Sequence, residues 1–308
     1  MRPRVKIKDL EVSKIALGTW ALGGGRDWGA ADDNNGAAAI LKAVELGINF
    51  IDTAPIYGNF HSETLLGKTL KNIRSKIVLA TKCGLLAGPR AVRRDLSPQS
   101  VREELEGSLR RLKTDYIDFY IIHWPDKNIP LSQTLGEMLR LKEAGKIRHI
   151  GVSNFDNTLL KEAVKFADIA VVQNEYSYLR RSAGEEVFET ARKHNIAFLA
   201  YGPLAGGILS GKYKKEPNLP NNDARNFFYK CYRGEAFKSA LDIASKFERI
   251  AVSRGVSAAQ VAINWVLANQ YVSCAVCGAR NPPQVEDIAS ALSWRLNASE
   301  QNFLTENK

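Results

Sequence analysis

Short apolar runs alternate with segments of helical periodicity along almost the whole chain. The runs are rich in apolar and β-branched residues and nearly continuous in apolar character, which is typical of parallel strands covered on both faces. The predicted strands are Ile15–Gly18, Ile48–Ile51, Ile77–Thr81, Tyr116–Ile122, His149–Val152, Ala170–Gln173, Ala197–Ala200 and Val272–Val276. Their number and alternation with helices predict an α/β fold, the (β/α)8 TIM barrel.

Start and stop signals mark several of the helices between these runs. Ser97-Pro98 predicts an N-cap followed by proline at the first helical position. Ser257 and Gln260 form the pattern of a capping box opening a helix over Ser257–Ala268. Asn281-Pro282 opens a last element that runs through Leu292, and the helix Leu135–Ala144 ends before Gly145, a suitable residue after a C-cap.

The predicted organisation is a single domain, residues 1–308, with one long insertion. A length of 308 residues suits one large barrel, and no linker or break in composition divides the chain. The longest irregular stretch, Lys212–Gly234, is rich in Pro, Asn and charged residues. In a barrel this stretch is predicted to be a loop over the C-terminal mouth, a candidate lid.

Bulk composition predicts a cytoplasmic protein with no membrane partner. Apolar residues make up 45% of the chain and charged residues 25%, and no apolar run approaches the ~20 residues of a membrane span. The basic N-terminus lacks a following hydrophobic region, so no signal peptide is predicted. Cys274-Ala-Val-Cys277 is interpreted as two buried thiols in a strand. The four histidines lack metal-ligand spacing, so no metal site is predicted.

The formal net charge of +10 predicts a solvated surface and, beyond it, a partner that carries phosphate. Nucleic acid is not the predicted partner, because zinc-finger spacing, an RNP-like aromatic motif and a sustained basic helix are all missing. A phosphorylated small molecule explains the charge more simply. Gly23-Gly24-Gly25 lacks the spacing of the dinucleotide-binding fingerprint, which disfavours a Rossmann dehydrogenase.

Three chemically active residues fall at the ends of three successive predicted strands. Asp52, Lys82 and His123 follow these strands about one strand–helix–strand unit apart, and Tyr57 lies in the loop after Asp52. In a barrel such positions line one mouth, so the four side chains are expected to converge. Each residue alone has an ordinary structural explanation, as a cap, a turn, a solvated charge or a packed histidine. All four together are expected to deliver a proton to a carbonyl oxygen.

Carbonyl reduction needs a hydride as well as a proton, and protein side chains cannot supply the hydride. A nicotinamide or flavin must therefore bind. Tyrosine titrates near pKa ~10, so a neighbouring ammonium group, Lys82, is expected to lower the pKa of Tyr57. Asp52 is expected to hold Lys82 charged and aimed, and His123 to hydrogen-bond the carbonyl oxygen or assist proton relay.

These residues stand in motifs that make the chain recognisable from about Val12 to Ala291. The motifs are Leu17-Gly-Thr-Trp20, Asn49-Phe-Ile-Asp-Thr-Ala-Pro-Ile-Tyr-Gly58, Thr81-Lys82, Ser97-Pro98 with Leu109–Asp118, His123-Trp-Pro125, Gly151-Val-Ser-Asn154 and Gln173-Asn-Glu-Tyr176. With them the chain resembles the aldo-keto reductase superfamily. The resemblance implies a barrel, a nicotinamide cofactor, reversible carbonyl reduction of a small molecule, and a catalytic set of Asp52, Tyr57, Lys82 and His123 with Tyr57 as general acid–base.

The resemblance also implies cofactor contacts, residue by residue. Ser153, Asn154 and Gln173 are similar to the clamp on the nicotinamide carboxamide, and Tyr201 to the ring that stacks on the nicotinamide. The first strand is expected to add Gly18, Thr19 and Trp20. The pyrophosphate loop is expected to use Gly202, Pro203, Leu204, Gly206, Leu209, Gly211 and Lys212, where glycine-rich backbone can approach phosphate closely.

The adenosine end of the cofactor is assigned to the segment after the last strand. Gly278, Ala279, Arg280, Gln284 and Asp287 resemble that part of the family. The best-known pattern has lysine, arginine and asparagine where Gly278, Gln284 and Ile288 stand here, so Arg280 is the candidate for a bidentate contact with a 2′-phosphate. NADP is the predicted cofactor, with NADPH preferred and NADH possible.

Two other roles and the walls of the substrate pocket complete the hypotheses. The family includes channel β subunits that keep barrel and cofactor but serve another protein, so a regulatory role is the alternative to an enzyme. A nucleic-acid-binding barrel rests on charge alone.

Trp20, Trp28, Phe60 and Trp124 are candidate aromatic walls of the substrate pocket. His123 favours reduction of an aldehyde, ketone or sugar carbonyl over reduction of an enone.

Overall fold

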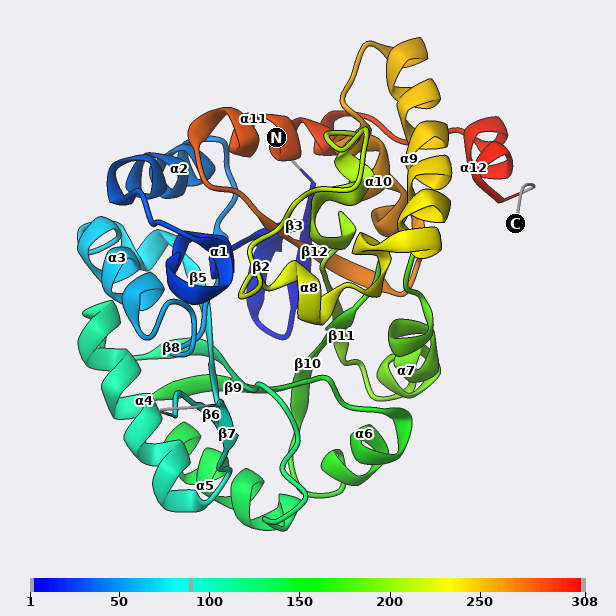
Figure 1. Cartoon of the computed structure of the whole chain (residues 1–308). Helices are drawn as coiled ribbons and strands as arrows, with labels where there is room; N and C mark the ends of the chain where they lie inside the picture. The colour runs from blue at the N-terminus through cyan, green and yellow to red at the C-terminus, as the bar shows by residue number, and fades with distance from the viewer. Residues whose placement is uncertain (1–2, 89–90, 306–308) are drawn as a thin grey trace.

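The computed structural model describes residues 3–88 and 91–305. Eight parallel strands pair in chain order and close into a barrel, with the helices ranged around it (Figure 1). The barrel strands are β3 (Ile15–Gly18), β4 (Phe50–Asp52), β5 (Val78–Cys83), β8 (Ile117–Ile122), β9 (Ile147–Ser153), β10 (Ile169–Glu175), β11 (Ala197–Tyr201) and β12 (Val272–Gly278). All eight predicted strands are confirmed with shifted ends, as for Ile48–Ile51, which is observed at Phe50–Asp52; strands such as β3, β5, β8 and β10 are buried on both faces and so have a continuous apolar sequence.

Helices follow the strands and cover the outside of the barrel. The longer ones are α2 (Asp33–Glu45), α3 (His61–Thr69), α4 (Pro98–Leu112), α5 (Leu131–Glu143), α6 (Asn157–Ala163), α7 (Ser182–Lys193), α9 (Gly234–Arg254), α10 (Ala258–Ala268), α11 (Pro282–Ser290) and α12 (Ala298–Thr305). Short helical turns are α1 (Gly25–Trp28), α8 (Arg225–Phe228), η1 (Trp20–Leu22), η2 (Arg74–Lys76), η3 (Ala205–Ser210), η4 (Lys230–Tyr232) and η5 (Ala291–Ser293).

The predicted helix ends are confirmed at Ser97, Gly145, Ser257 and Asn281, but α5 begins at Leu131 rather than at the predicted Leu135, and one capping box is corrected. The Ser97 side chain caps α4, Asn281 caps α11, and Gly145 takes a φ of +72° just after α5. Ser257 caps α10 as predicted, but Gln260 does not complete the capping box. Its Oε1, the atom that a capping box uses, accepts instead from Trp294 Nε1 at 3.0 Å, while its Nε2 donates to Asp287 on α11.

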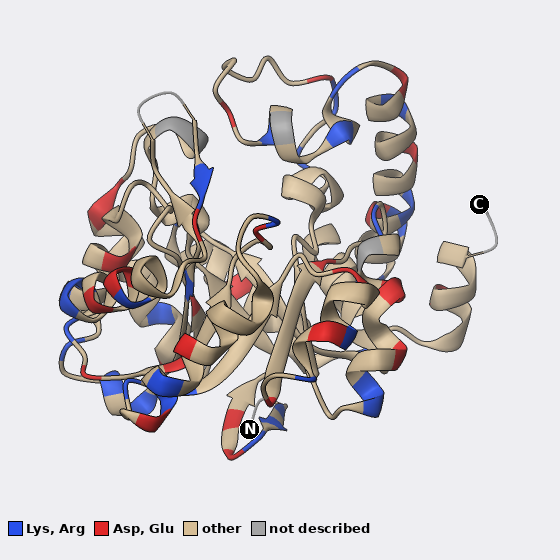
Figure 2. Cartoon of the chain, turned by 90° about the horizontal axis from the view of Figure 1, so that it is seen from below, with Lys and Arg blue, Asp and Glu red and all other residues tan. Residues whose placement is uncertain are grey.

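A hairpin that the sequence analysis did not predict closes the end of the barrel where the strands begin. Strands β1 (Arg4–Ile7) and β2 (Leu10–Ser13) pair antiparallel and project at that end in Figure 2. Ile7 and Leu10 join the buried cluster inside the barrel, with Phe119. The barrel interior is therefore apolar at this end, which leaves the opposite mouth for polar chemistry.

Residues 212–234, the cover segment, cross the C-terminal mouth as predicted, but they are not a structureless loop. The segment contains α8 and η4, and α8 lies in front of the barrel in Figure 1. Phe228 packs edge-on against Trp20, with ring centroids 4.9 Å apart. Arg225 forms an ion pair with Asp223 and lies over the ring of Trp28 at 5.5 Å. The cover segment is thus attached to the loop that follows β3.

A second hairpin stands beside the mouth: β6 (Leu85–Leu86) and β7 (Arg93–Arg94) pair antiparallel directly after β5. On the side seen in Figure 2, Lys and Arg are interspersed with Asp and Glu around the outside of the barrel.

Cys274 and Cys277 are buried free thiols on β12, as predicted. In the described part of the chain, no single helix is long and apolar enough to cross a membrane; α9 and α10 meet that test only together, across a bend of 104°.

Candidate active site

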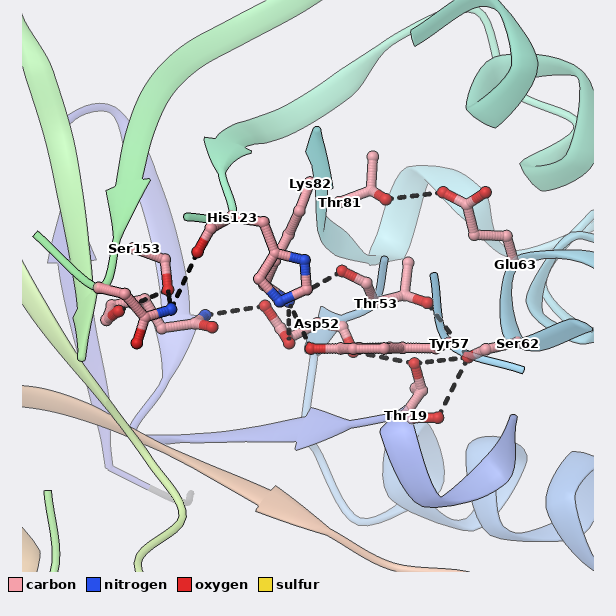
Figure 3. A network of polar contacts seen from close by, with 12 residues as sticks. Thr19, Asp52, Thr53, Tyr57, Ser62, Glu63, Thr81, Lys82, His123 and Ser153 are labelled. Carbon is pink, nitrogen blue, oxygen red and sulfur yellow. Dashed lines mark hydrogen bonds and ion pairs between the residues drawn. The ribbon is translucent and has the colours of Figure 1, made fainter. Parts of the chain in front are cut away.

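Three of the four predicted catalytic side chains meet in direct hydrogen bonds at the C-terminal mouth, and the fourth lies against them (Figure 3). The Lys82 Nζ donates to Asp52 Oδ2 at 2.7 Å and to Tyr57 Oη at 3.1 Å. The His123 ring stands edge-on to the Tyr57 ring, with centroids 5.7 Å apart. Neighbouring strands β4, β5 and β8 carry Asp52, Lys82 and the start of the His123 loop, so the parallel register brings these groups together.

Burial determines the charge state of the phenol. Lys82 is completely buried and Asp52 nearly so. Burial raises the pKa of Tyr57 well above its ordinary value, and the charge of Asp52 raises it further. The predicted lowering of this pKa by Lys82 is therefore wrong. Lys82 is paired with the Asp52 carboxylate, and burial together with that negative charge outweighs the ammonium in setting the resting pKa of Tyr57. Tyr57 is a neutral phenol at physiological pH and can donate its proton.

His123 is a neutral imidazole for the same physical reason. Burial lowers the pKa of His123 well below its ordinary value, and the neighbouring Lys82 charge adds to that effect. Its backbone carbonyl accepts a hydrogen bond from Asn154 Nδ2 at 2.9 Å, which fixes the start of the loop after β8. A neutral imidazole can donate one hydrogen bond to a carbonyl oxygen without contributing charge.

A buried set of hydroxyl groups supports Asp52 and the loop that carries Tyr57 (Figure 3). The Thr19 Oγ1 donates to the backbone carbonyl of Asp52 at 3.0 Å and accepts from Ser62 Oγ at 2.7 Å. Ser62 Oγ also lies 3.1 Å from Thr53 Oγ1, and the Thr53 carbonyl accepts from Lys82. The sequence analysis missed the roles of Ser62 and Thr53, since no sequence spacing marks a hydroxyl that bonds across elements.

Two glycines set the position of the Tyr57 loop. A Cβ added to Gly23 would lie 2.7 Å from both Gly58 N and the carbonyl carbon of Tyr57. Gly58 has a φ of +60°, and a Cβ there would lie 2.0 Å from the Gly23 carbonyl oxygen. The two backbones therefore touch at a point where only glycine fits. This contact fixes Tyr57 relative to the loop after β3.

The predicted nicotinamide clamp shares hydrogen bonds with the catalytic residues. Gln173 Nε2 donates to Asp52 Oδ1 at 2.8 Å. Tyr201 Oη donates to Asn154 Oδ1 at 2.7 Å, and Asn154 Nδ2 donates to Ser153 Oγ at 3.0 Å. These side chains are therefore held in place by the protein itself, beside the oxygen of Tyr57.

The predicted pyrophosphate loop has the backbone such a site needs. Gly202, Gly206 and Gly211 all have positive φ, which frees the loop to turn its amide groups toward a ligand. The Lys212 ammonium lies within 2.9 Å of the Cβ position of Gly207, so a positive charge stands against this backbone. The loop also includes two buried residues, Pro203 and Leu209. Leu204 packs against two buried apolar clusters, one around the barrel and one under α9 and α10.

Tyr229 of the cover segment lies on the pyrophosphate loop. Its ring atoms are 2.8 Å from the Cβ position of Gly206, and its hydroxyl is 3.2 Å from that of Gly202. The nearby carboxyl of Glu175 is buried and pairs with Arg180 at 3.1 Å. Burial raises the pKa of Glu175 to about 7. The sequence analysis named neither Tyr229 as a contact of this loop nor Glu175 as a titrating group.

The residues assigned to the adenosine end are engaged with the protein. Gly278 ends β12 and is exposed, whereas Ala279 is buried. The Arg280 backbone amide donates to Gln284 Oε1, and the Arg280 guanidinium donates to the carbonyl oxygens of two residues in the loop after β3. Asp287 accepts hydrogen bonds from Ser257 and from Gln260, so it supports the start of α10.

Of the four candidate aromatic walls, two form a contact chain that reaches Tyr57. Trp20 stacks on Tyr57 with ring centroids 6.1 Å apart, and Trp28 stands edge-on to Trp20 at 5.3 Å. Trp124 lies under the guanidinium of Arg94 at 5.3 Å. Phe60 is 41% exposed, and its ring packs against the guanidinium of Arg111 at the start of α3. Within residues 3–88 and 91–305, no group of three or more His, Cys, Asp or Glu side chains gathers as metal ligands do.

Known proteins similar to the chain share both this architecture and a common family. At the level of structure, the glycerol dehydrogenase of Gluconobacter oxydans superposes with a TM-score of 0.90 at 37% sequence identity, over 98% of this chain and 94% of that one. At the level of sequence, the aldo-keto reductase YhdN of Bacillus subtilis is 37% identical over 304 residues, which are 97% of this chain and 91% of that protein.

A second sequence relative is the NADH-specific methylglyoxal reductase of Escherichia coli, 32% identical over 313 aligned positions, with 97% of this chain and 95% of that protein covered. The model of the aldo/keto reductase family matches residues 14–306, nearly the whole chain. The resemblance drawn from the motifs is thereby confirmed. The chain belongs to the aldo/keto reductase family and is a nicotinamide-dependent oxidoreductase acting on carbonyl and alcohol groups.

Proposed function

We propose that the protein catalyses reversible hydride transfer between NADP and an aldehyde, ketone or sugar carbonyl, with Tyr57 as the general acid–base. One observation carries the proposal: Lys82 Nζ bonds both Asp52 and Tyr57 Oη in a buried cluster at the barrel mouth. Reduction adds a hydride to carbon and a proton to oxygen. A neutral phenol, stacked on one side by Trp20 and bordered by a neutral imidazole, suits delivery of that proton.

The proton moves from Tyr57 Oη to the substrate oxygen. As the phenol loses its proton, the Lys82 ammonium at 3.1 Å stabilises the developing phenolate by a charge-assisted hydrogen bond. Asp52 keeps the ammonium charged and fixed at 2.7 Å. His123 donates a hydrogen bond to the same substrate oxygen and so orients the carbonyl. In the oxidation direction each step reverses.

The residues at the mouth fit a nicotinamide cofactor, which supplies the hydride. Gln173, Asn154 and Ser153 offer amide and hydroxyl groups for a carboxamide, and Tyr201 offers a ring for stacking. The glycine backbone after β11 and the ammonium of Lys212 offer a phosphate site.

NADPH is the proposed preferred form, with Arg280 as the ligand of the 2′-phosphate. A relative described as NADH-specific shows that the family also includes enzymes with the opposite preference. In this chain Arg280 is half-buried beside the proposed adenosine site, and its guanidinium is planar and permanently charged, which suits bidentate contact with a phosphate.

The proposal is tested by following absorbance at the nicotinamide band as NADPH or NADH is oxidised with methylglyoxal, glyceraldehyde and other aldehydes. In the reverse direction, NADP⁺ or NAD⁺ is mixed with glycerol and its reduction is followed. The described activities of two relatives make these three-carbon compounds the first choice. Turnover with NADPH supports the proposal. Tight cofactor binding without turnover of any aldehyde, ketone or sugar favours the regulatory role instead.

A further inference from the structure

Arg280 connects the segment after β12 with the loop after β3. Its Nη2 donates to the carbonyl oxygen of Ala30 at 2.8 Å, and its Nη1 donates to that of Trp28 at 3.4 Å. The two carbonyls face one guanidinium fork, so a single side chain fixes two neighbouring points of the loop. A planar, permanently charged guanidinium forms such two-point contacts well, because its donors are pre-arranged.

Loop 24–31, defined as residues 24 to 31, has a backbone that depends on such an external contact. Gly24, Gly25 and Gly29 all have positive φ, and a chain rich in glycine has many conformations to lose when it is ordered. Gly29, Ala30 and the residue after them are exposed. The loop contains only the four-residue turn α1.

Loop 24–31 reaches the reacting phenol through two rings. Trp28 stands edge-on to Trp20 at 5.3 Å, and Trp20 stacks on Tyr57 at 6.1 Å. Trp28 Nε1 is buried and lacks a hydrogen-bond partner among the described residues, so packing rather than a polar contact of its own holds the indole. The position of this aromatic wall therefore depends on the loop backbone that Arg280 holds, together with Arg225 and Phe228 of the cover segment.

We propose that Arg280 is a positioning residue for the carbonyl substrate, in addition to the 2′-phosphate role proposed above. It braces loop 24–31 and, through Trp28 and Trp20, sets the aromatic wall beside Tyr57. The inference rests on the proposed reductase function. It differs from phosphate binding in one consequence: the brace also acts in turnover with NADH, which has no 2′-phosphate to compete for the guanidinium.

The decisive experiment is therefore carried out with NADH. In Arg280→Ala, the KM for the aldehyde at saturating NADH is expected to rise roughly tenfold, equivalent to about 1.4 kcal/mol, while kcat stays within about twofold. The near-UV circular dichroism of the cofactor-free protein is expected to change, because Trp20 and Trp28 lose their fixed edge-on geometry. A general loss of structure would lower kcat and the melting temperature instead.

Two further variants complete the design. Arg280→Lys keeps the positive charge but not the fork, so it is expected to retain part of the NADPH preference and still show the raised aldehyde KM with NADH. Arg295→Ala is the matched control: this exposed arginine also donates to the carbonyl oxygen of a tryptophan, Trp294, but on the segment that leads into α12. It is expected to leave KM and the spectrum unchanged.

An aldehyde KM and a near-UV spectrum identical to those of the unmodified protein in Arg280→Ala would overturn the inference and leave Arg280 as a phosphate ligand only. If the unmodified protein turns over no carbonyl, the proposed function fails. The spectrum then decides alone whether Arg280 fixes the two tryptophans.

Discussion

The proposed catalytic cluster at the ends of β4 and β5 and the proposed adenosine site after β12 lie at the same mouth but are built differently. Asp52 and Lys82 are buried, and their hydrogen bonds run to one another and to the phenol that we propose reacts. Arg280, Gln284 and Asp287 are more exposed, and each is bonded within the protein: Gln284 to the Arg280 amide, Arg280 to the loop after β3 and Asp287 to the start of α10. The first region is held in place before any ligand binds, as the proposed proton transfer requires, whereas the side chains of the second are already bonded to the protein.

This difference predicts at which of the two sites a ligand must replace hydrogen bonds within the protein in order to bind. At the catalytic cluster, a substrate meets groups that are already in place, so little reorganisation is needed. At the adenosine site, a phosphate that binds Arg280 competes with two backbone carbonyls for the same guanidinium. Selectivity for NADPH over NADH is therefore expected to be modest, and the catalytic step is expected to be much more sensitive to mutation than cofactor affinity.

The largest effect is expected from Tyr57→Phe, which removes the proposed proton donor and keeps the ring that stacks on Trp20. Turnover should fall by roughly a thousandfold or more, while the dissociation constant for NADPH, measured by fluorescence titration, changes by about twofold or less. Tyr271→Phe, on the loop before β12, is the matched control and should turn over normally. Normal rates in Tyr57→Phe would end the assignment.

Next is Lys82→Met, which removes the ammonium and leaves Asp52 buried without its partner. Turnover is expected to fall by about a hundredfold or more, and the free energy of unfolding by roughly 3 to 5 kcal/mol, the usual cost of breaking a buried ion pair. The double variant Asp52→Asn with Lys82→Met should recover much of the stability in urea unfolding but none of the activity. Recovered activity would show that the pair serves folding alone.

Gly23→Ala is expected to have an intermediate effect. The new Cβ meets the Tyr57 and Gly58 backbone at 2.7 Å, so the loop that carries the phenol must shift. Misplacement on this scale is expected to lower kcat by roughly ten- to a hundredfold. Gly136→Ala in α5 is the control, since open space surrounds its Cβ position. Steady-state kinetics that show equal rates for both variants would contradict a fixed Tyr57 loop.

The smallest effect is expected from Asp287→Ala at the adenosine site. The change removes the acceptor for Ser257 and Gln260 at the start of α10. The free energy of unfolding should fall by about 1 to 2 kcal/mol, measured by urea titration, with NADPH affinity nearly unchanged. A large loss of NADPH affinity without loss of stability would mean that Asp287 acts mainly on the cofactor.

The sequence predicted the barrel well because a strand buried on both faces must be apolar throughout, as β8 and β10 are. The hairpin β1–β2 was missed, because Lys6, Lys8 and Arg4 dominate a short segment whose apolar positions only alternate. The partners of this hairpin are distant in the chain; Lys8, for example, forms an ion pair with Asp168. The pattern of Ser257 and Gln260 was local, but Trp294, 34 residues away in the chain, donates to the Gln260 oxygen that a capping box uses.

At the site, the sequence indicated which residues meet but not the charge state that results. Asp52 and Lys82 were identified from strand ends, and Tyr57 from the loop after Asp52, since parallel strands place their carboxyl ends at one mouth. The direction of the Tyr57 pKa shift was wrong, because it depends on how deeply the Asp52–Lys82 pair is buried. The carbonyl oxygens that the Arg280 guanidinium contacts belong to Trp28 and Ala30, some 250 positions away in the chain. Such distant contacts leave no local sequence pattern.

The pH dependence of carbonyl reduction tests the central claim, that the Tyr57 phenol donates the proton. The raised pKa of Tyr57 keeps the donor protonated, and the lowered pKa of His123 keeps the imidazole neutral. Neither group changes charge near neutrality, so kcat/KM for an aldehyde at saturating NADPH should stay level between about pH 7 and pH 9. A tenfold fall for each pH unit across that range would contradict the account, because it would require a donor that titrates near neutrality.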